Sequence, residues 1–441
     1  MPGSATYHSR SRHALIFCVV LAAFAAALYK AARHPAPAVF QAPAVAAQAV
    51  NAAPELHTHF VSTQHNIHTH ASSLVELGDG RIRAFWFAGS NEGAQDVEIR
   101  SAVLDPATNQ WGAESSVANR EDTQRALLRY VKKLGNPVAQ HTADGTLWLF
   151  YVTVSLGGWA GSSITAITSK DDGATWSTPR RLITSPFINI STLVKGTPYF
   201  YSDGSIGLPV YHEFIGKFGE LLRISGSGEI IDKQRLSSGK SAIQPVMLIR
   251  SPQQAMALMR YTGAGSKRVI ATATEDAGRH WSLPAKTALA NPDAALSGAV
   301  LPNGQHGGRI LLALNDIETG RDALSLVISN DSGATWETVY QLEDQRGQPA
   351  DPARYMQIAS DLAKATDAGI GDASAYAKSA RRNKCVAQSC GYEFSYPYLI
   401  QSRNGDFHLV YTWNRSYIKH VRFTRAWLDQ RLEKTADAKL H

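Results

Sequence analysis

Five histidines form the densest cluster of this residue type in the chain: His57, His59, His65, His68 and His70. Side chains at i and i+2 of a β-strand point to the same face, so His68 and His70 are predicted to share one. Paired imidazoles suit a metal ion, but no cysteine or carboxylate at a zinc-ligand spacing accompanies them. We therefore expect no metal, a substrate contact for His70, and structural polar packing for the others.

Further polar candidates stand beside predicted strands. Tyr211 and His212 are neighbours in PVYHEF, and neighbours on a strand point to opposite faces, so only one of them can enter a site. Other candidates lie where strands should approach a central channel: Asn136 in LGNPV, Lys195 in LVKGTP, and Asn414 and Arg415 in YTWNRSYIKH. For each of these, a solvated surface position is the alternative interpretation.

The three cysteines indicate an oxidising compartment. Cys18 lies in an apolar segment, whereas Cys385 and Cys390 enclose a short loop in CVAQSC. In an exported protein, thiols this close in sequence are expected to form a disulfide. Two unpaired buried thiols are the alternative.

Hairpins are the elements that would position these residues. A glycine after Asp or Asn precedes an apolar strand in five places, which begin at Gly78, Ala143, Ser202, Pro302 and Arg403. A sixth strand, in SPQQAMALMRY from Ser251, lacks the glycine. Such dipeptides favour the left-handed angles of tight hairpins. Most of the hairpins recur at intervals of roughly 50 to 65 residues, which is typical of four-stranded propeller blades.

The predicted fold is therefore all-β, a six-bladed β-propeller over residues 56–427. Residues Asp351–Arg382 are rich in Ala, Lys and Asp and fill the long gap before the last blade, where we expect a small, partly helical insertion. Residues 428–441 are expected to form a polar tail.

The N-terminal segment 1–34 has the pattern of an export signal. The apolar stretch Ala14–Leu28 follows Arg10 and Arg12, which is what the secretion machinery recognises. Two outcomes remain open, an uncleaved anchor in the bacterial inner membrane or a removed signal peptide. Residues 35–55, mostly Ala, Pro and Val, are expected to be a linker. Both outcomes place the bulk of the chain in the periplasm or outside the cell.

Charge gives no support for a nucleic-acid partner. The net charge is +7, but four basic residues precede residue 35, which leaves 40 basic against 37 acidic residues. That balance lacks the excess of positive charge that such proteins carry.

A polar turn motif occurs three times in the sequence, as SKDDGATW (169–176), TEDAGRHW (274–281) and SNDSGATW (329–336). The pattern Ser-x-Asp-x-Gly-x-Thr-Trp resembles the Asp-box of sialidases and other propeller glycosidases. Its Asp and Ser or Thr can bond the backbone of their own turn. We therefore assign Asp171, Asp276 and Asp331 a structural role.

The resemblance covers roughly residues 56–425 and is to the bacterial predicted-neuraminidase group. Sialidases hold the substrate carboxylate with three arginines, use an Asp as acid/base, and attack with a Tyr that a Glu assists. A neutral phenol avoids the repulsion that a carboxylate nucleophile would meet at a sugar acid. Guanidinium groups match the sugar carboxylate with two hydrogen bonds.

Four positions carry over from the family pattern. The resemblance makes Arg260 and Arg321 the second and third arginines, Asp96 the acid/base, and Tyr396 the nucleophile. The pattern departs at two others, because His70 stands where the first arginine is expected and Gln244 where the assisting Glu is expected. By position, Glu213 and Glu393 are the two candidates to replace that base.

The resemblance implies an exported exo-glycosidase, without cofactor, that cleaves a terminal acidic sugar from a glycan or glycolipid. That sugar would be sialic acid or another ulosonic acid such as Kdo. One alternative is a polysaccharide lyase that uses His70, His212 and Tyr211. The other is a glycan-binding propeller without catalysis. Nothing in the sequence identifies a partner subunit.

Overall fold

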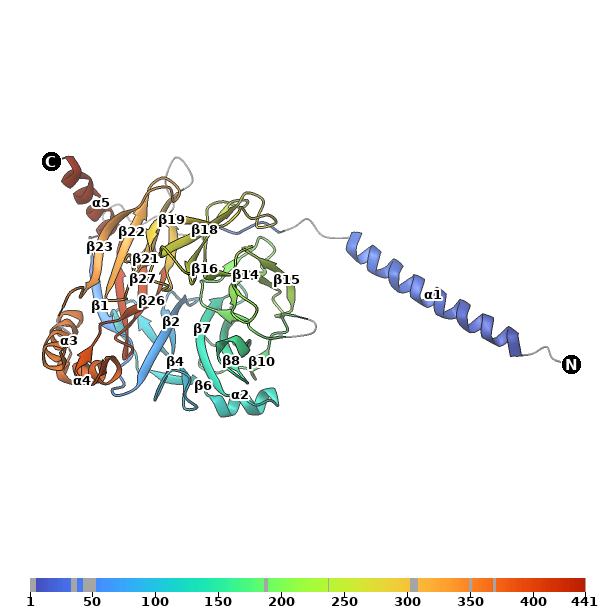
Figure 1. The fold of residues 1–441 in the computed structure, drawn as a ribbon, viewed down its shortest axis with the longest axis horizontal. Helices are drawn as coiled ribbons and strands as arrows, with labels where there is room; N and C mark the ends of the chain where they lie inside the picture. The colour runs from blue at the N-terminus through green and yellow to red at the C-terminus, as the bar shows by residue number, and fades with distance from the viewer. Residues whose placement is uncertain are drawn as a thin grey trace. The chain divides into compact units, whose positions relative to one another are not determined.

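The computed structural model describes residues 5–32, 38–42, 53–185, 189–236, 238–301, 308–348, 351–367 and 370–440 (Figure 1). The chain divides into two compact units, Met1–Val39 and Phe40–His441. The first contains α1 (Ala5–Ala32), an unbroken helix because the segment holds neither Gly nor Pro. Within the described ranges, no helix combines the length and the apolar character needed to span a membrane.

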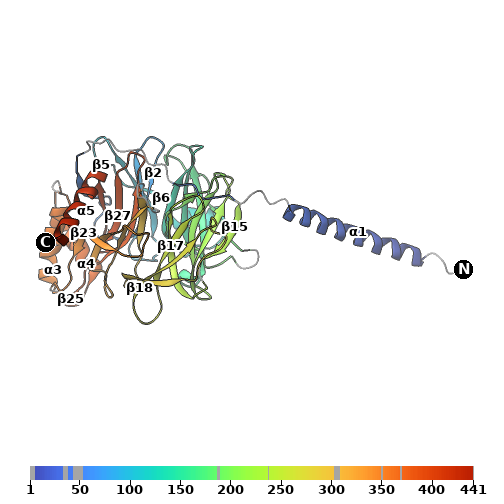
Figure 2. The ribbon, with the colours of Figure 1, turned by 90° about the horizontal axis from the view of Figure 1, so that it is seen from above.

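The second unit consists mostly of antiparallel β-sheets that follow one another along the chain (Figures 1 and 2). The first sheet contains β2 (His68–Glu76), β3 (Ile82–Gly89), β4 (Glu98–Asp105), β5 (Gln110–Trp111) and β6 (Ser115–Ala118). The second contains β7 (Lys133–His141), β8 (Leu147–Val154), β9 (Ser162–Ser169) and β10 (Arg180–Arg181).

A nine-stranded sheet holds two groups of strands, joined where β14 pairs in parallel with β16. Its first group is β11 (Leu193–Val194), β12 (Tyr199–Phe200), β13 (Ile206–His212), β14 (Lys217–Ile224) and β15 (Ile230–Arg235). Its second group is β16 (Ser241–Ile249), β17 (Ala255–Tyr261), β18 (Arg268–Thr274) and β19 (Ala285–Ala290).

Two further four-stranded sheets complete the body. One contains β20 (Ser297–Leu301), β21 (Arg309–Leu314), β22 (Ala323–Ser329) and β23 (Glu337–Asp344). The other has the order β1-β28-β27-β26 and contains β26 (Phe394–Gln401), β27 (Phe407–Trp413), β28 (Tyr417–Phe423) and β1 (Leu56–Phe60). The prediction of an all-β chain is confirmed.

Neighbouring groups of strands contact one another in sequence, mostly through their first strands, although the β11–β15 group contacts β16 through β13. Strand β2 contacts β7 and β26, β7 contacts β11, β13 contacts β16, and β20 contacts β16 and β26. The strands are largely buried because apolar side chains such as Phe85, Phe87, Leu149 and Tyr151 fill the space between adjacent sheets. These sheets hold the beginnings of their first strands close to one another.

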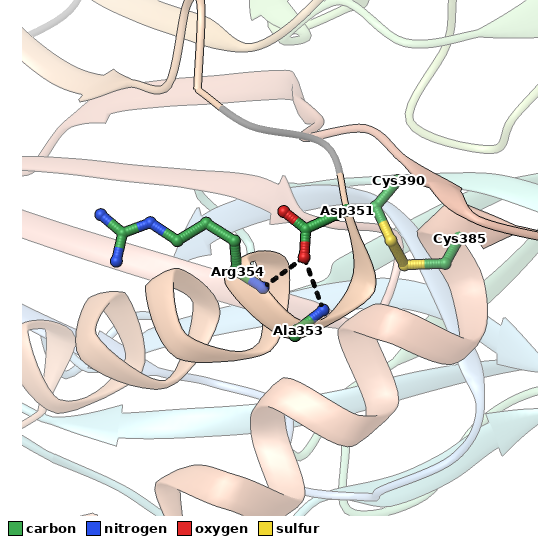
Figure 3. The surroundings of a disulfide bond; sticks show 5 residues. All are labelled: Asp351, Ala353, Arg354, Cys385 and Cys390. Carbon is green, nitrogen blue, oxygen red and sulfur yellow. Dashed lines mark hydrogen bonds between the residues drawn. A yellow bond between two sulfur atoms is a disulfide. The ribbon is translucent and has the colours of Figure 1, made fainter.

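The insertion before β26 is more helical than predicted. It forms α3 (Pro352–Thr366) and α4 (Ala373–Lys384), followed by a hairpin of β24 (Cys385–Val386) and β25 (Ser389–Cys390). Figure 3 shows Asp351 accepting hydrogen bonds from the backbone N–H groups of Ala353 and Arg354, which caps α3. The disulfide Cys385–Cys390 joins the two strands of the hairpin.

Two segments outside the predicted propeller also pack on the body. The expected polar tail continues α5 (Arg425–Leu440), where Trp427 and Leu428 are buried. In the expected linker, Phe40 is buried and pairs with Tyr201, while residues 43–52 lie outside the described part. Single apolar residues in these polar or proline-rich segments are sufficient to attach them. The two short helices α2 (Arg120–Leu127) and η1 (Trp159–Gly161) lie in loops.

The three repeated turns bind their own backbone. Asp171, Asp276 and Asp331 each accept a hydrogen bond from the backbone N–H four residues later, at 2.8 to 2.9 Å. The hydroxyl or ring nitrogen of that same later residue also contacts the carboxylate. These bonds lower the pKa of each Asp to about 2. These hydrogen bonds stabilise the turns, which is a structural role.

Candidate functional site

The candidate site lies at one end of the sheets. In each group, the loop between the second and third strands lies at the end where the first strand begins, because the strands are antiparallel. We call this the site end. Tyr396 and Gln244 lie near the beginnings of β26 and β16, and Arg260 and Tyr211 lie near the ends of β17 and β13. The three Asp-boxes, between third and fourth strands, lie at the opposite end.

Four first strands carry an irregularity at equivalent places. Their register shifts next to Ala71, Asn136, Gln244 and Tyr396, each of which has a positive φ between 31° and 57°. A bulge of this kind re-aims a side chain. Non-glycine residues rarely adopt such angles, and strained residues gather at functional sites. Three of the four precede a proline, a sequence signal that marks the same position in three sheets.

Tyr396 is at the centre of the site. Its hydroxyl accepts hydrogen bonds from Gln244 Nε2 at 3.2 Å and from Arg260 Nη1 at 3.4 Å. Gln244 Oε1 in turn accepts from Arg260 Nη1 at 3.1 Å, which fixes the orientation of the amide. Two donors aimed at one phenolic oxygen stabilise negative charge on it. No carboxylate among the described residues is within hydrogen-bonding distance of this hydroxyl.

The amide of Gln244 also connects Tyr396 to the opposite wall. Gln244 Nε2 donates to the hydroxyl of Tyr211 at 3.3 Å, and Asn136 Nδ2 donates to the same oxygen at 3.2 Å. Burial, and then the proximity of Tyr396, raise the pKa of Tyr211 well above its usual value. Tyr211 therefore stays neutral. His212 points away, stacks on Phe218, and accepts a hydrogen bond from the Ile215 backbone.

A single loop residue holds both predicted arginines. The Asp293 carboxylate accepts from Arg260 Nε at 2.7 Å, and its backbone carbonyl accepts from Arg321 Nη2 at 2.9 Å. Burial lowers the pKa of Arg260, but the nearby Tyr396 and Asp293 raise it above its usual value overall. The Arg321 guanidinium carbon lies 6.0 Å from the centre of the Tyr396 ring. Arg260, Arg321 and Tyr396 therefore converge.

Glu393 is the most heavily paired carboxylate of the site. Its Oε2 accepts from Arg415 Nε and Lys384 Nζ, each at 2.8 Å, and its Oε1 lies 3.5 Å from Arg321 Nη1. Burial alone would raise its pKa, but Arg415 and Lys384 hold it well below the usual range. Glu393 therefore remains ionised. Its carboxylate oxygens contact Arg415, Lys384, Arg321 and Ser395, and in the described part of the chain they do not reach the Tyr396 hydroxyl, so Glu393 lacks the geometry of a base for it.

His70 lies against the nucleophile candidate. The centres of the His70 and Tyr396 rings are 4.3 Å apart, and His70 Nδ1 lies 3.0 Å from Thr412 Oγ1. Burial, followed by the charge of Arg415, lowers the pKa of His70 well below its usual value and that of His68 to about 4. Both imidazoles are neutral at pH 7. The described residues contain no cluster of His, Cys, Asp and Glu that could hold a metal.

Lys195 contacts the strand that carries Tyr396. Its Nζ donates to the carbonyl of Pro397 at 2.9 Å and lies 5.8 Å from the centre of the Tyr396 ring. Burial lowers the pKa of Lys195 to about 7. This side chain fixes the backbone that carries Tyr396 and does not contact the Tyr396 hydroxyl.

Two predicted acids stand apart from Tyr396. Asp96 accepts from the backbone and the hydroxyl of Ser90, so it closes its own loop, beside a cavity of about 280 Å³. The backbone N–H of Glu213 donates to Ser191 Oγ at 2.7 Å, and its carboxylate is close enough to Tyr211 to raise the pKa of that phenol. Neither carboxylate is among the described contacts of Tyr396.

Glu92 and Asp293 are site residues that sequence reasoning did not identify. Glu92 belongs to the same loop as Asp96, and its Oε2 accepts from Arg415 Nη1 at 2.6 Å. Arg415 was only a general polar candidate, and it reaches the site because Asn414 and Arg415 both have positive φ angles of about 50°. The NR pair after a strand was the available signal for Arg415. Nothing comparable marks Glu92 or Asp293.

The arrangement can bind an anion beside a phenol. Arg260, Arg321 and Arg415 supply three guanidinium groups, and Lys384 adds an ammonium group. Asp293, Glu393 and Glu92 provide three carboxylates as their partners. The site therefore keeps an excess of positive charge next to a hydroxyl that is surrounded by donors.

Comparisons with known proteins give the family and the fold. A family model described as a BNR repeat-like domain matches residues 80–409. Three solved structures that resemble the chain are the Hadza microbial sialidase Hz136, a protein of unknown function from Dyadobacter fermentans, and the intramolecular trans-sialidase from Ruminococcus gnavus. No curated protein sequence matches.

These likenesses are distant in sequence. The Hadza sialidase has a TM-score of 0.59 at 16% identity, covering 81% of this chain and 66% of its own. The Dyadobacter protein has a TM-score of 0.59 at 14% identity, and the alignment covers 83% of this chain and 98% of that protein. The Ruminococcus enzyme has a TM-score of 0.54 at 13% identity, and the alignment covers 82% of this chain and 95% of that enzyme. Such identities establish the fold alone. Because the family model spans most of its length, the chain belongs to the sialidase-like BNR-repeat family.

Proposed function

We propose that the chain is an exported exo-glycosidase that hydrolyses the ketosidic bond of a terminal acidic sugar. The substrate class is sialic acid or a related ulosonic acid such as Kdo, on an envelope or extracellular glycan. The observation that carries this proposal is the convergence of Arg260 and Arg321 on Tyr396. Carboxylate recognition and a nucleophile are thereby placed within one site.

The proposed scaffold is a six-bladed propeller. Each of the six groups of strands is one blade, and β1 pairs with β28 so that the beginning of the body completes its last blade. The contacts between successive groups of strands support this closure. Such a ring would bring β2, β7, β11, β16, β20 and β26 around one axis, with the site at its mouth.

In the proposed reaction, Arg260 and Arg321 bind the carboxylate on the anomeric carbon. The Tyr396 oxygen attacks that carbon, and the bond to the leaving oxygen breaks. Arg260 and Gln244 stabilise the phenolate as it forms, and the phenolic proton passes to water. Water then cleaves the sugar from Tyr396.

The proton for the leaving oxygen is proposed to come from Glu92 instead of Asp96. Glu92 is the carboxylate of this loop that reaches a site arginine, whereas Asp96 is occupied by Ser90. A substrate carboxylate that attracts Arg415 would weaken its pairing with Glu92. The freed carboxylate then accepts, through water, the proton that leaves Tyr396 and delivers it to the leaving oxygen as that bond breaks.

A second candidate function is glycan binding without catalysis. Gln244 favours it, because an amide stands beside Tyr396 where the family pattern has a carboxylate base. The test is to incubate the full chain with envelope glycolipid and a panel of acidic glycosides and to identify released sugars by mass. If sugar is released and Tyr396→Phe abolishes that release, hydrolysis is supported. Saturable binding without release of sugar supports the second candidate. An unsaturated product with ultraviolet absorbance would instead indicate a lyase.

A further inference from the structure

A group of large apolar side chains is exposed at the site end of two neighbouring sheets. Leu128 is 94% exposed, Leu156 is 75% exposed and Ile215 is 71% exposed. We call the full set the apolar rim: Leu128, Tyr130, Leu156, Ile183, Phe214 and Ile215. Exposed leucine or isoleucine occurs singly on many surfaces, but a gathering of six on adjacent loops indicates an interaction site.

The rim belongs to four adjacent loops of the β7–β10 and β11–β15 groups. Leu128 and Tyr130 follow α2, which contacts β10 and lies beside these sheets in Figure 1. Leu156 lies in the loop between β8 and β9, Ile183 follows β10, and Phe214 and Ile215 lie between β13 and β14. Each of these loops is at the end where its group's first strand begins. The rim therefore faces the same side as Tyr396.

Hydrogen bonds hold these loops together. Arg129 Nε donates to Ser155 Oγ at 2.7 Å and Lys132 Nζ to the carbonyl of Gly157 at 3.3 Å, which attaches the end of α2 to the β8–β9 loop. The backbone of Glu213 donates to Ser191 Oγ at 2.7 Å, which attaches the β13–β14 loop to the segment after β10. The rim is thus a constructed surface and not a set of separate loose tips.

Basic residues without carboxylate partners surround the rim. Arg129, Lys132, Lys217 and Lys240 are exposed, and in the described part of the chain none forms an ion pair. Lys217 and Lys240 flank Phe214 and Ile215, since the backbone of Lys217 bonds that of Lys240. A hollow of about 580 Å³ beside Leu128 and Tyr130 is lined by the unpaired Arg129, by Arg120 and Arg125, which pair with Glu121 and Asp122, and by Glu121 itself.

We propose that this rim docks on a lipid bilayer that contains anionic lipids. Protruding apolar tips with a Tyr and unpaired Lys and Arg between them are the features that insert at a headgroup layer. A protein partner would instead favour a packed patch depleted of lysine. Docking in this way turns the mouth of the site toward sugars attached to membrane lipids. The inference concerns where the protein binds and does not depend on catalysis at Tyr396.

The test uses a fluorescent probe on the full chain. A polarity-sensitive fluorophore is attached to Leu156→Cys, and the matched control carries it on Leu283→Cys, which is equally exposed but lies at the opposite end, beside an Asp-box. Both proteins also carry Cys18→Ser, Phe17→Asp and Leu21→Asp, which remove the free thiol and the apolar stretch of α1. Vesicles contain phosphatidylcholine alone or mixed with phosphatidylglycerol.

With mixed vesicles, the probe at position 156 should shift to the blue and the probe at 283 should not. Lys217→Gln and Lys240→Gln should each raise the vesicle concentration for half of the shift about fivefold, because a surface charge contributes that much to anionic membrane binding. The proposal is overturned by equal shifts at both probes, by no shift, or by independence from phosphatidylglycerol. A shift that protein concentration alone produces would show instead that a second copy covers the rim.

Discussion

The side-chain amide of Gln244 donates to the hydroxyl of Tyr396 at 3.2 Å while it accepts from Arg260 at 3.1 Å. A carboxylate in this place would act as a base toward the phenol. The amide instead supplies a donor, so it stabilises the phenolate and leaves deprotonation to water. This relationship separates the site from the family pattern and sets its expected dependence on pH.

Replacing Gln244 should distinguish these roles. We expect Gln244→Leu to lower kcat about 100-fold, because it removes a donor to the developing charge. Gln244→Glu should keep kcat within about tenfold and make it depend on a carboxylate that titrates below pH 7. The measurement is a pH–rate profile for each variant. Equal kcat in all three proteins would contradict a role for this amide.

Arg260 is expected to bind the substrate carboxylate. Arg260→Lys should raise KM about 30-fold, roughly 2 kcal/mol, because an ammonium group cannot reproduce the paired hydrogen bonds of a guanidinium. The matched control is Arg268→Lys, which alters a surface ion pair with Glu318. With a methyl ester of the same glycoside as substrate, wild type and Arg260→Lys should have the same KM. An equal loss on the ester and the free acid would argue against carboxylate binding.

Lys195 should make stability depend on pH. Its pKa is about 7 in the folded protein and near 10.5 when unfolded, so between these values the unfolded chain binds more protons. The free energy of unfolding should therefore rise as pH increases through this window, by at most about 1.4 kcal/mol per pH unit. Lys195→Met should remove that rise, whereas exposed Lys132→Met should not. Urea unfolding at pH 7 and pH 9 measures the difference.

The disulfide of the helical insertion should stabilise the fold without taking part in the reaction. Replacing Cys385 and Cys390 together by Ser should lower the free energy of unfolding by only about 2 kcal/mol, because the loop that the disulfide closes is short. The neighbouring Lys384 still pairs with Glu393, so KM should change less than threefold. Urea unfolding and steady-state kinetics test both statements. A loss of activity in a protein that stays folded would show that the hairpin positions the site.

The architecture was largely predictable, because turns and apolar strands recur at a regular spacing. Arg260, Arg321 and Tyr396 were also predictable, since strands and Asp-boxes mark their places. Site residues whose positions depend on loop conformation could not be predicted from the sequence. Glu92 and Asp96 are four residues apart, and only their side-chain contacts, Asp96 with Ser90 and Glu92 with Arg415, show which of them faces the site.

Other omissions have a similar physical origin. Asp293 and Arg415 reach the site through residues with positive φ, which no hydrophobic period reveals. The attachment of Phe40, Trp427 and Leu428 rests on single apolar side chains in segments that otherwise read as linker and tail.

The central claim is that the Tyr396 oxygen forms a bond to the sugar. The most direct measurement is the mass of the protein after acid quenching during turnover of an acidic glycoside, followed by mapping of its peptides. The account predicts an added mass of one sugar residue on the peptide that contains Tyr396, absent from Tyr396→Phe and present in Tyr398→Phe. Rapid sugar release by Tyr396→Phe at the wild-type rate would contradict it.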